Sequence, residues 1–229
     1  CPVLQHMDKA ACIDVVSNVG LHRQREANGR QRRGAGGIAA LVEPPQQHRQ
    51  RPAHAAPPVV AVMVVHEPGE WFAETLASLA AQDYPDLRLV ALLTSTTPPT
   101  VADAIEAAVP AALVRIVEGN PGFGPVANQV MAVVDGHDGF LLFLHDDVAL
   151  QPDVVSQLVA EAFRSNAAMV GPKLVEWDTP SVLQHVGLDA DRTGRLVDVV
   201  DPGERDQQQH DAVRDTFALP SACMLVRND

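Results

Sequence analysis

The sequence has 229 residues, 46% of them hydrophobic, and a formal net charge of −12 at pH 7. Such a chain can bury one domain-sized core, and its longest apolar runs, at 59–65 and 140–144, are too short to cross a bilayer. Residues 1–58 carry eight lysines and arginines against four acidic residues, whereas residues 59–229 carry nine against 25. An acidic globular part argues against nucleic acid as the partner, because phosphate contacts require lysine and arginine.

The three cysteines, Cys1, Cys12 and Cys223, show no Cys-x-x-Cys spacing, so neither a disulfide framework nor a zinc knuckle is predicted. Unpaired thiols are typical of a reducing compartment. We therefore expect a cytoplasmic protein that lies, at most, at the inner face of the plasma membrane. Any membrane association would come from regions outside these residues, because a membrane helix needs about 20 apolar residues.

The first part of the chain, residues 1–57, is rich in glutamine, arginine, histidine, glycine and proline and shows no sustained hydrophobic periodicity. Such a segment buries too little apolar surface to offset the entropy lost on ordering. We predict a disordered, low-complexity tail here and a folded domain over residues 58–229. The arginine cluster at 30–33 could contact nucleic acid or anionic lipid, although a solvated tail is the simpler interpretation.

From residue 59 onward, segments of strand character alternate with segments of helix character. The predicted strands lie at residues 59–65, 87–93, 113–117 and 140–144. Segments with apolar residues at helical spacing follow each of them, around residues 71–80, 101–109, 130–134 and 152–163. This alternation predicts an α/β fold with a mostly parallel, Rossmann-type sheet flanked by helices.

A glycine-rich loop, Glu-Gly-Asn-Pro-Gly-Phe-Gly-Pro-Val-Ala-Asn-Gln at residues 118–129, leads into the third of these helices. Glycines let the backbone approach a ligand closely, and free N–H groups at a helix start favour an anion. The loop has neither the Gly-Lys-Ser/Thr of a Walker A motif nor the dinucleotide G-x-G-x-x-G. A phosphate-binding loop and an ordinary turn of glycine and proline both fit this pattern.

The strand at 140–144 ends abruptly in His145, Asp146 and Asp147. Neighbouring carboxylates are costly to bury, so we expect them in a crevice where a positive charge, such as a divalent cation, offsets them. Ligands in open α/β sheets bind at the carboxyl ends of the strands. The other interpretation is that the two aspartates only precede the helix predicted to start at Pro152, because carboxylates stabilise a helix N-terminus.

The pattern changes after this helix. Residues 169–175 form a short apolar run broken by Gly-Pro, residues 189–209 are polar and acidic, and residues 217–226 resemble a strand interrupted at Pro220 and Ser221. We expect this half of the domain to build the acceptor side of a cleft.

Taken in order, several segments resemble the family 2 glycosyltransferases, over roughly residues 59–229. Residues 62–72 and 75–85 are similar to the family's first strand, loop and "TLxSLxxQxYP" helix. Residues 120–128 are similar to its glycine-rich segment ending in Asn. Residues 144–148 stand at the place of its D-x-D motif. Residues 183–187 resemble large actinobacterial members that build cell-envelope polysaccharide.

This resemblance implies a GT-A fold that transfers a sugar from a nucleotide-diphosphate sugar to a glycan or lipid-linked acceptor, in a metal-assisted, inverting reaction. Mn²⁺ or Mg²⁺ would bridge the diphosphate and neutralise the leaving group. By position, His145 and Asp147 would hold the metal. The implied donor-binding residues are Asp146 at the ribose or sugar, Glu67 near the base, and His66, Ser95, Gly122 and Asn128 around them.

Three departures from the family pattern bear on these roles. His145 replaces the first Asp of D-x-D, and imidazole suits Mn²⁺ better than Mg²⁺. Thr94 and Ser95 replace an acidic residue that reads the base, which leaves only hydroxyl hydrogen bonds there. The family's catalytic base lies downstream of the last strand, so we expect it beyond Asp229 and expect this chain to be an N-terminal piece of a longer enzyme.

Two other hypotheses stay open at this point. The missing base and His145 also fit a catalytically incomplete or pseudo-enzyme that only binds a nucleotide or a protein partner. A nucleotidyltransferase shares the α/β frame and the metal dependence, but it would need a basic residue in the glycine-rich loop to hold a triphosphate. Residues 118–128 contain neither lysine nor arginine.

Overall fold

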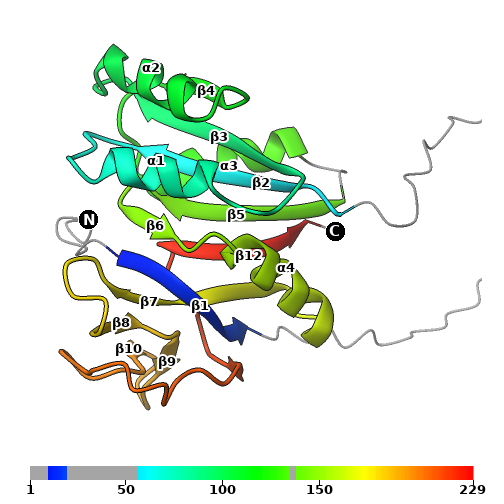
Figure 1. The fold of residues 1–229 in the computed structure, drawn as a ribbon, viewed down its shortest axis with the longest axis vertical. Helices are drawn as coiled ribbons and strands as arrows, with labels where there is room; N and C mark the ends of the chain where they lie inside the picture. Colours follow the sequence, from blue (N-terminus) through cyan, green and yellow to red (C-terminus); the bar gives the residue numbers. More distant parts are fainter. Residues whose placement is uncertain (1–9, 20–55, 135–137, 229) are drawn as a thin grey trace, which may run out of the picture.

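The computed structural model describes residues 10–19, 56–134 and 138–228. They form one mixed sheet with helices on both faces and, at one end, a small two-stranded sheet (Figure 1). The helices are α1 (Phe72–Ala80), α2 (Pro99–Ala108), α3 (Phe123–Val134) and α4 (Val154–Ser165). The strands are β1 (Ala10–Val19), β2 (Val59–Val65), β3 (Leu87–Thr94), β4 (Leu113–Val117), β5 (Gly139–His145), β6 (Val148–Leu150), β7 (Met169–Glu176), β8 (Leu183–His185), β9 (Leu188–Ala190), β10 (Leu196–Asp198), β11 (Arg214–Asp215) and β12 (Cys223–Asn228).

Four parallel strands form one half of the main sheet, in the order β4-β3-β2-β5. The central strands β2 and β5 are aliphatic and buried along most of their length, as expected for strands covered on both faces. Val65 pairs with Leu93, and Val64 pairs with His145, so β2, β3 and β5 end at the same edge of the sheet. The predicted α/β fold, with a mostly parallel sheet between helices, is confirmed.

The other half of the sheet contains antiparallel strands. β12 runs antiparallel between β5 and β7, and its first residue, Cys223, pairs with Leu144. The chain that precedes Cys223 therefore reaches the end of β5. β7 runs unbroken through Gly171 and Pro172, because its partner β1 has a register shift next to Pro172, where a missing N–H is tolerated.

One strand lies within the segment that the sequence predicted to be disordered. β1 pairs antiparallel with β7 and parallel with β6 and β11. The run Ala-Ala-Cys-Ile-Asp-Val-Val is apolar and β-branched enough to add to the edge of β7, a property that the polar average of residues 1–57 conceals. Within this segment the structure describes only residues 10–19, as the strand β1, and residues 1–9 and 20–55 lie outside the described part.

Separate cores lie on the two faces of the sheet. α1, α2 and α4 pack on one face, in a cluster that includes Leu76 and Ile105. α3 packs on the other face through residues such as Val126, and the sheet residues Val60 and Val90 are only partly buried there. No helix in the described ranges is both long and apolar enough to span a membrane.

The helix ends follow local signals in the sequence. Pro99 occupies the first turn of α2, where its missing N–H is not needed. α4 starts at Val154, two residues after the predicted start at Pro152, and ends at Asn166, whose φ of 55° is a left-handed helix cap. These short helices place the loops before them at the carboxyl edge of the parallel strands.

Candidate functional site

Segments next to five strands meet at the carboxyl edge of the parallel sheet. β2 is followed by His66, β5 by Asp146, and β12 is preceded by Ser221, while β3 and β4 lead into a hydroxyl-rich loop and the glycine-rich loop. Because the parallel strands end together and β12 starts beside β5, residues 80 positions apart in the sequence hydrogen-bond directly, as His66 and Asp146 do. Residues 145–147, here called the acidic loop, therefore lie at the same sheet edge as the glycine-rich loop.

Asp146 lies in the partly buried acidic loop, where its Oδ2 accepts a hydrogen bond from the backbone N–H of His66 at 3.2 Å. Burial is the largest influence and raises the pKa of Asp146 from 3.8 to about 7. The N–H of His66 opposes this rise, and the charge of Asp147 adds to it. A carboxyl group held this far from its ordinary pKa is typical of a functional site.

The imidazole of His66 connects two further loops to this one. Its Nδ1 lies 2.8 Å from Thr94 Oγ1, and its Nε2 lies 3.0 Å from Asn120 Nδ2. The Oδ1 atom of Asn120 in turn accepts the N–H of Gly122 at 3.3 Å. His66 therefore joins the loops that follow β3, β4 and β5.

His145 is held on two sides. Its Nε2 lies 3.1 Å from Ser221 Oγ, and its ring meets the ring of Phe123 edge to face, with centroids 4.7 Å apart. Burial lowers the pKa of His145 to about 4, so the imidazole is neutral at physiological pH. The contact with Phe123 brings the start of α3, which follows the glycine-rich loop, against the acidic loop.

Asp147 completes the acidic loop, and its Oδ1 lies 4.0 Å from His145 Nδ1. Because His145 is neutral, this contact does not balance the carboxylate charge. Burial also raises the pKa of Asp147. Among the residues whose side chains the structure describes, no lysine or arginine pairs with Asp146 or Asp147. Within the described side chains, the negative charge of this loop therefore has no cationic partner.

A divalent cation fits this loop with two protein ligands. Asp147 offers Oδ1, and His145 offers Nδ1, since its Nε2 is already bonded to Ser221. In the described ranges, no group of three or more His, Cys, Asp or Glu side chains could hold an ion. A hard cation needs six or more ligands, so the others would come from water and from a bound molecule with oxygen atoms, such as a diphosphate.

The remaining predicted donor-site residues differ in their surroundings. Ser95 Oγ accepts the N–H of Gly119 at 3.0 Å, which ties the loop after β3 to the glycine-rich loop. Glu67 is exposed and has a φ of 51°, uncommon for a residue other than glycine. Asn128 lies on the exposed side of α3, and its side chain makes no hydrogen bond within the described residues. Ser95 and Gly122 thus join the cluster, whereas Glu67 and Asn128 remain open to solvent.

Four residues of this cluster were not among the predicted site residues: Thr94, Asn120, Phe123 and Ser221. Thr94 is the last residue of β3 and Asn120 lies three residues after β4, so both stand near strand ends that the sequence predicted. No signal in the sequence pointed to Ser221, because its contact with His145 depends on the antiparallel placement of β12. That placement is a property of the sheet and not of the local sequence.

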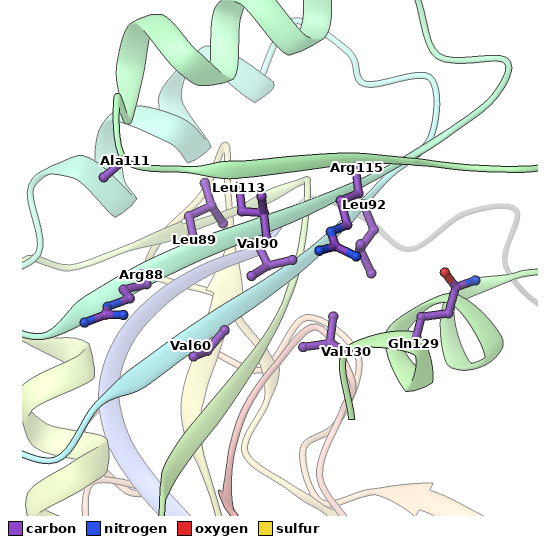
Figure 2. A pocket seen from close by; sticks show the side chains of 10 residues that line it. All are labelled: Val60, Arg88, Leu89, Val90, Leu92, Ala111, Leu113, Arg115, Gln129 and Val130. Carbon is purple, nitrogen blue, oxygen red and sulfur yellow. The ribbon is translucent and has the colours of Figure 1, made fainter. Parts of the chain in front are cut away.

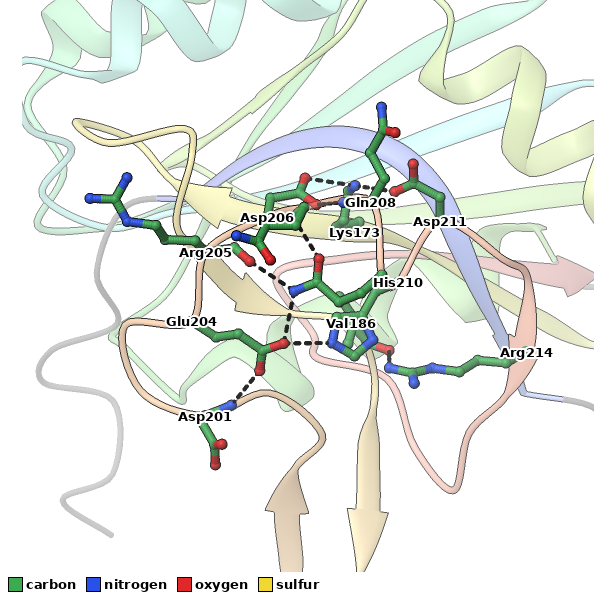
Figure 3. Close-up of polar contacts among 12 residues, drawn as sticks. Lys173, Val186, Asp201, Glu204, Arg205, Asp206, Gln208, His210, Asp211 and Arg214 are labelled. Carbon is green, nitrogen blue, oxygen red and sulfur yellow. Dashed lines mark hydrogen bonds and ion pairs between the residues drawn. The ribbon is translucent and has the colours of Figure 1, made fainter.

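A second polar cluster lies beyond β7 and holds the acidic segment 201–211 (Figure 3). Lys173 is 2% exposed, and its Nζ contacts Asp206 at 2.7 Å and Asp211 at 2.6 Å. Burial alone would lower the pKa of Lys173, but the hydrogen bonds to both carboxylates outweigh it and raise the pKa. These bonds fix a segment that has little regular structure of its own.

Glu204 makes hydrogen bonds within the same segment (Figure 3). Its carboxylate accepts hydrogen bonds from the side chain of Gln209 and the backbone N–H of Asp201, both at 2.9 Å, and lies 2.9 Å from His210 Nε2. These bonds, with that of Gln209 the largest, lower the pKa of Glu204 to about 2. The segment continues through β11 to Ser221, which contacts His145 at the acidic loop.

A hollow of about 370 Å³ lies on the α3 face of the sheet (Figure 2). Its lining is mostly aliphatic, with Val90 near the middle and Val130 on α3, and its polar side chains are those of Arg88, Arg115 and Gln129. No residue of the acidic loop lines it, and of the glycine-rich segment 118–129 it includes only Gln129, which lies within α3. The hollow is therefore separate from the cluster around Asp146.

Comparison with known proteins agrees with this arrangement. The family model described as "Glycosyl transferase family 2" matches residues 60–222, a range that contains the strand ends, the glycine-rich loop, the acidic loop and Ser221. The chain belongs to glycosyl transferase family 2. Its mostly parallel sheet between helices agrees with the α/β frame that the sequence resemblance implied.

Relatives of this family 2 domain include the O-antigen biosynthesis protein RfbC of Myxococcus xanthus, 25% identical over 232 residues that cover 96% of this chain. The chain spans 18% of the length of that relative. Similar solved structures include a mannosyltransferase, PcManGT of Pyrobaculum calidifontis, in complex with GDP-Man and Mn²⁺ (TM-score 0.33, 19% identity, 41% of this chain and 28% of that one). Another is TarS of S. aureus in complex with UDP-GlcNAc (TM-score 0.42, 18% identity, 49% of this chain and 33% of that one).

Proposed function

We propose that this family 2 domain binds a nucleotide-diphosphate sugar at the carboxyl edge of its sheet and transfers the sugar, with inversion, to a glycan or lipid-linked acceptor. The observation that carries the proposal is the pair Asp146 and Asp147, both desolvated, with pKa values raised by burial and no cationic partner among the described side chains. Such a pair is costly unless it serves a ligand that supplies positive charge.

The roles of the side chains follow from their positions. Asp147 and the Nδ1 atom of His145 would hold Mn²⁺ or Mg²⁺, and the cation, when bound, neutralises the charge of the departing diphosphate. Asp146 would bind the ribose or the sugar of the donor. Glu67, exposed at the end of β2, would lie near the base.

The glycine-rich loop would contribute the other side of the donor pocket. Gly122 and Ser95 lie in the linked loops after β4 and β3, and Asn128 stands exposed one turn beyond the start of α3. His66 belongs to the same proposed donor site. Backbone N–H groups of a glycine-rich loop suit the oxygen atoms of a diphosphate.

The acceptor side is proposed to be the wall formed by the segment from 201 to 221. Its bonds to Lys173 and the internal bonds of Glu204 order it, and its last residue, Ser221, contacts His145. A relative that functions in O-antigen biosynthesis supports a cell-envelope polysaccharide as the class of acceptor. Work on such an acceptor would place the domain in the cytoplasm, at the inner face of the plasma membrane.

The proposal is tested by titration calorimetry with UDP-, GDP- and dTDP-sugars, in the presence of Mn²⁺ or Mg²⁺. One of these donors should bind with a measurable heat, and Asp147→Ala should abolish that heat while circular dichroism shows an intact fold. Asp103→Asn, at an exposed site on α2, makes a similar change of net charge and should bind as the parent does. A folded protein that binds none of the donors would refute the proposal.

Transfer itself needs a separate readout. Release of nucleoside diphosphate from the bound donor, in the presence of a glycan acceptor, would identify an active transferase. Donor binding without any release would instead identify a nucleotide-binding domain that lacks catalysis, the second hypothesis raised by His145 in place of an aspartate.

A further inference from the structure

We infer that the imidazole of His66 is a positioning residue: it latches the glycine-rich loop to the acidic loop and does not itself touch the donor. The inference deepens the proposed donor site and concerns how that site is kept in shape. Its starting observation is that His66 is exposed, yet both of its ring nitrogens have protein partners.

The direction of each hydrogen bond follows from the donors and acceptors present. Asn120 Oδ1 accepts the N–H of Gly122, so the NH₂ group of Asn120 faces His66 Nε2, which must accept. The ring proton then lies on Nδ1 and is donated to Thr94 Oγ1 at 2.8 Å. The hydroxyl of Thr94 can in turn donate a hydrogen bond to Thr97 Oγ1, 3.1 Å away. The network therefore selects the tautomer of His66 with its N–H at Nδ1.

This network leaves the ring with neither a free lone pair nor a free N–H for a ligand. The backbone N–H of His66 is committed as well, because it donates to Asp146 Oδ2. One residue thus ties together the loops after β3, β4 and β5. Imidazole suits the task because it places one donor and one acceptor on opposite sides of a rigid ring.

The glycine-rich loop depends on such polar ties, because packing does not hold it. Gly119 and Gly122 have φ values of +70° and +90°, and a Cβ atom added to either would meet no other atom within 4 Å. Two hydrogen bonds hold the loop instead. The N–H of Gly119 donates to Ser95, and the side-chain NH₂ of Asn120 donates to His66. Without His66, the second tie is lost and the N–H groups of the loop are no longer fixed for a diphosphate.

Hydrogen exchange of the protein without ligand tests the latch directly. A net hydrogen bond of about 1 kcal/mol corresponds to roughly a fivefold change in an equilibrium. His66→Ala and Asn120→Ala should each speed exchange of the hydrogen-bonded amides of Gly119 and Gly122 by about fivefold. His66→Gln keeps an acceptor and a donor and should restore slow exchange, at least in part. Gln157→Ala, which removes an exposed amide contact to Asp153 on α4, should leave these amides unchanged.

A double-mutant cycle on donor affinity separates a latch from two ligand contacts. If His66 and Asn120 act as one unit, each single alanine variant weakens binding of the donor by about fivefold, and the double variant is no weaker. Multiplied losses in the double variant, or weakened binding with unchanged exchange, would overturn the inference, because either result means direct contact with the ligand. Unchanged exchange in both alanine variants would overturn it as well.

The exchange experiment uses no donor, so the two proposals fail separately. A parent protein that binds no nucleotide sugar, yet shows faster exchange in His66→Ala and Asn120→Ala, would refute the donor site and keep the latch. A parent protein that binds a donor with the same affinity as both alanine variants would refute the latch and keep the donor site.

Discussion

The buried carboxyl group of Asp146 should make the ligand-free protein less stable as the pH rises. Its pKa is 3.8 as an ordinary aspartate and about 7 in the folded protein, so folding favours the protonated form. Between about pH 4 and pH 7 the unfolded chain is therefore ionised at Asp146 while the folded protein keeps its proton, so stability falls across this range. A shift of about three units corresponds to about 4 kcal/mol, which is an upper limit because the side chain keeps some contact with water.

Replacing Asp146 by Asn removes this penalty, because asparagine does not ionise. Urea unfolding without divalent cations should show that Asp146→Asn gains more stability over the parent at pH 8 than at pH 5, where only about 1.6 kcal/mol of the penalty is present. Asp103→Asn on α2 controls for the change in net charge. Parallel curves of stability against pH for the parent and Asp146→Asn would refute the physical reasoning, since they would mean that Asp146 titrates alike in the folded and unfolded chain.

The same carboxyl group and two other features give further predictions. Donor binding that needs ionised Asp146 should weaken about fivefold from pH 7 to pH 6, because its pKa is about 7, as calorimetry at both pH values would measure. Lys173→Met should lower the free energy of unfolding by about 3 kcal/mol, the low end for a broken buried ion pair, because Asp211 is 42% exposed and can regain water. Lys173→Met/Asp206→Asn should recover part of that loss. Deletion of residues 1–19 should lower the melting temperature and increase light scattering, because it exposes the edge of β7 that β1 covers.

Each of these predictions has an outcome that contradicts it. Donor affinity that does not change between pH 7 and pH 6 would show that the ligand does not need the ionised form of Asp146. A Lys173→Met variant as stable as the parent would mean that the carboxylates around Lys173 are already solvated. An unchanged melting temperature after deletion of residues 1–19 would show that β1 contributes nothing to the sheet in solution.

Much of the fold was predictable because it depends on local pattern. The aliphatic runs of β2, β3, β4 and β5 have strand length, and the segments between them have helical spacing, so the parallel half of the sheet follows from the order of elements. β1 was missed because its ten residues stand in a long polar stretch whose average composition is that of a disordered tail. The outer half of the sheet was only partly predictable, since antiparallel pairing across more than fifty residues leaves no periodic mark on the chain.

The chemistry of the site divides in the same way. The sequence by itself determined which groups stand at the ends of the strands, including Asp146, Asp147 and the glycines of the loop, because a strand end is set by the chain itself. Only the tertiary structure decided what those groups do to one another: that the N–H of His66 reaches Asp146, that its ring meets Asn120, and that Ser221 engages His145. These contacts join different strands, and their distances exist only once the strands have paired in one order and register.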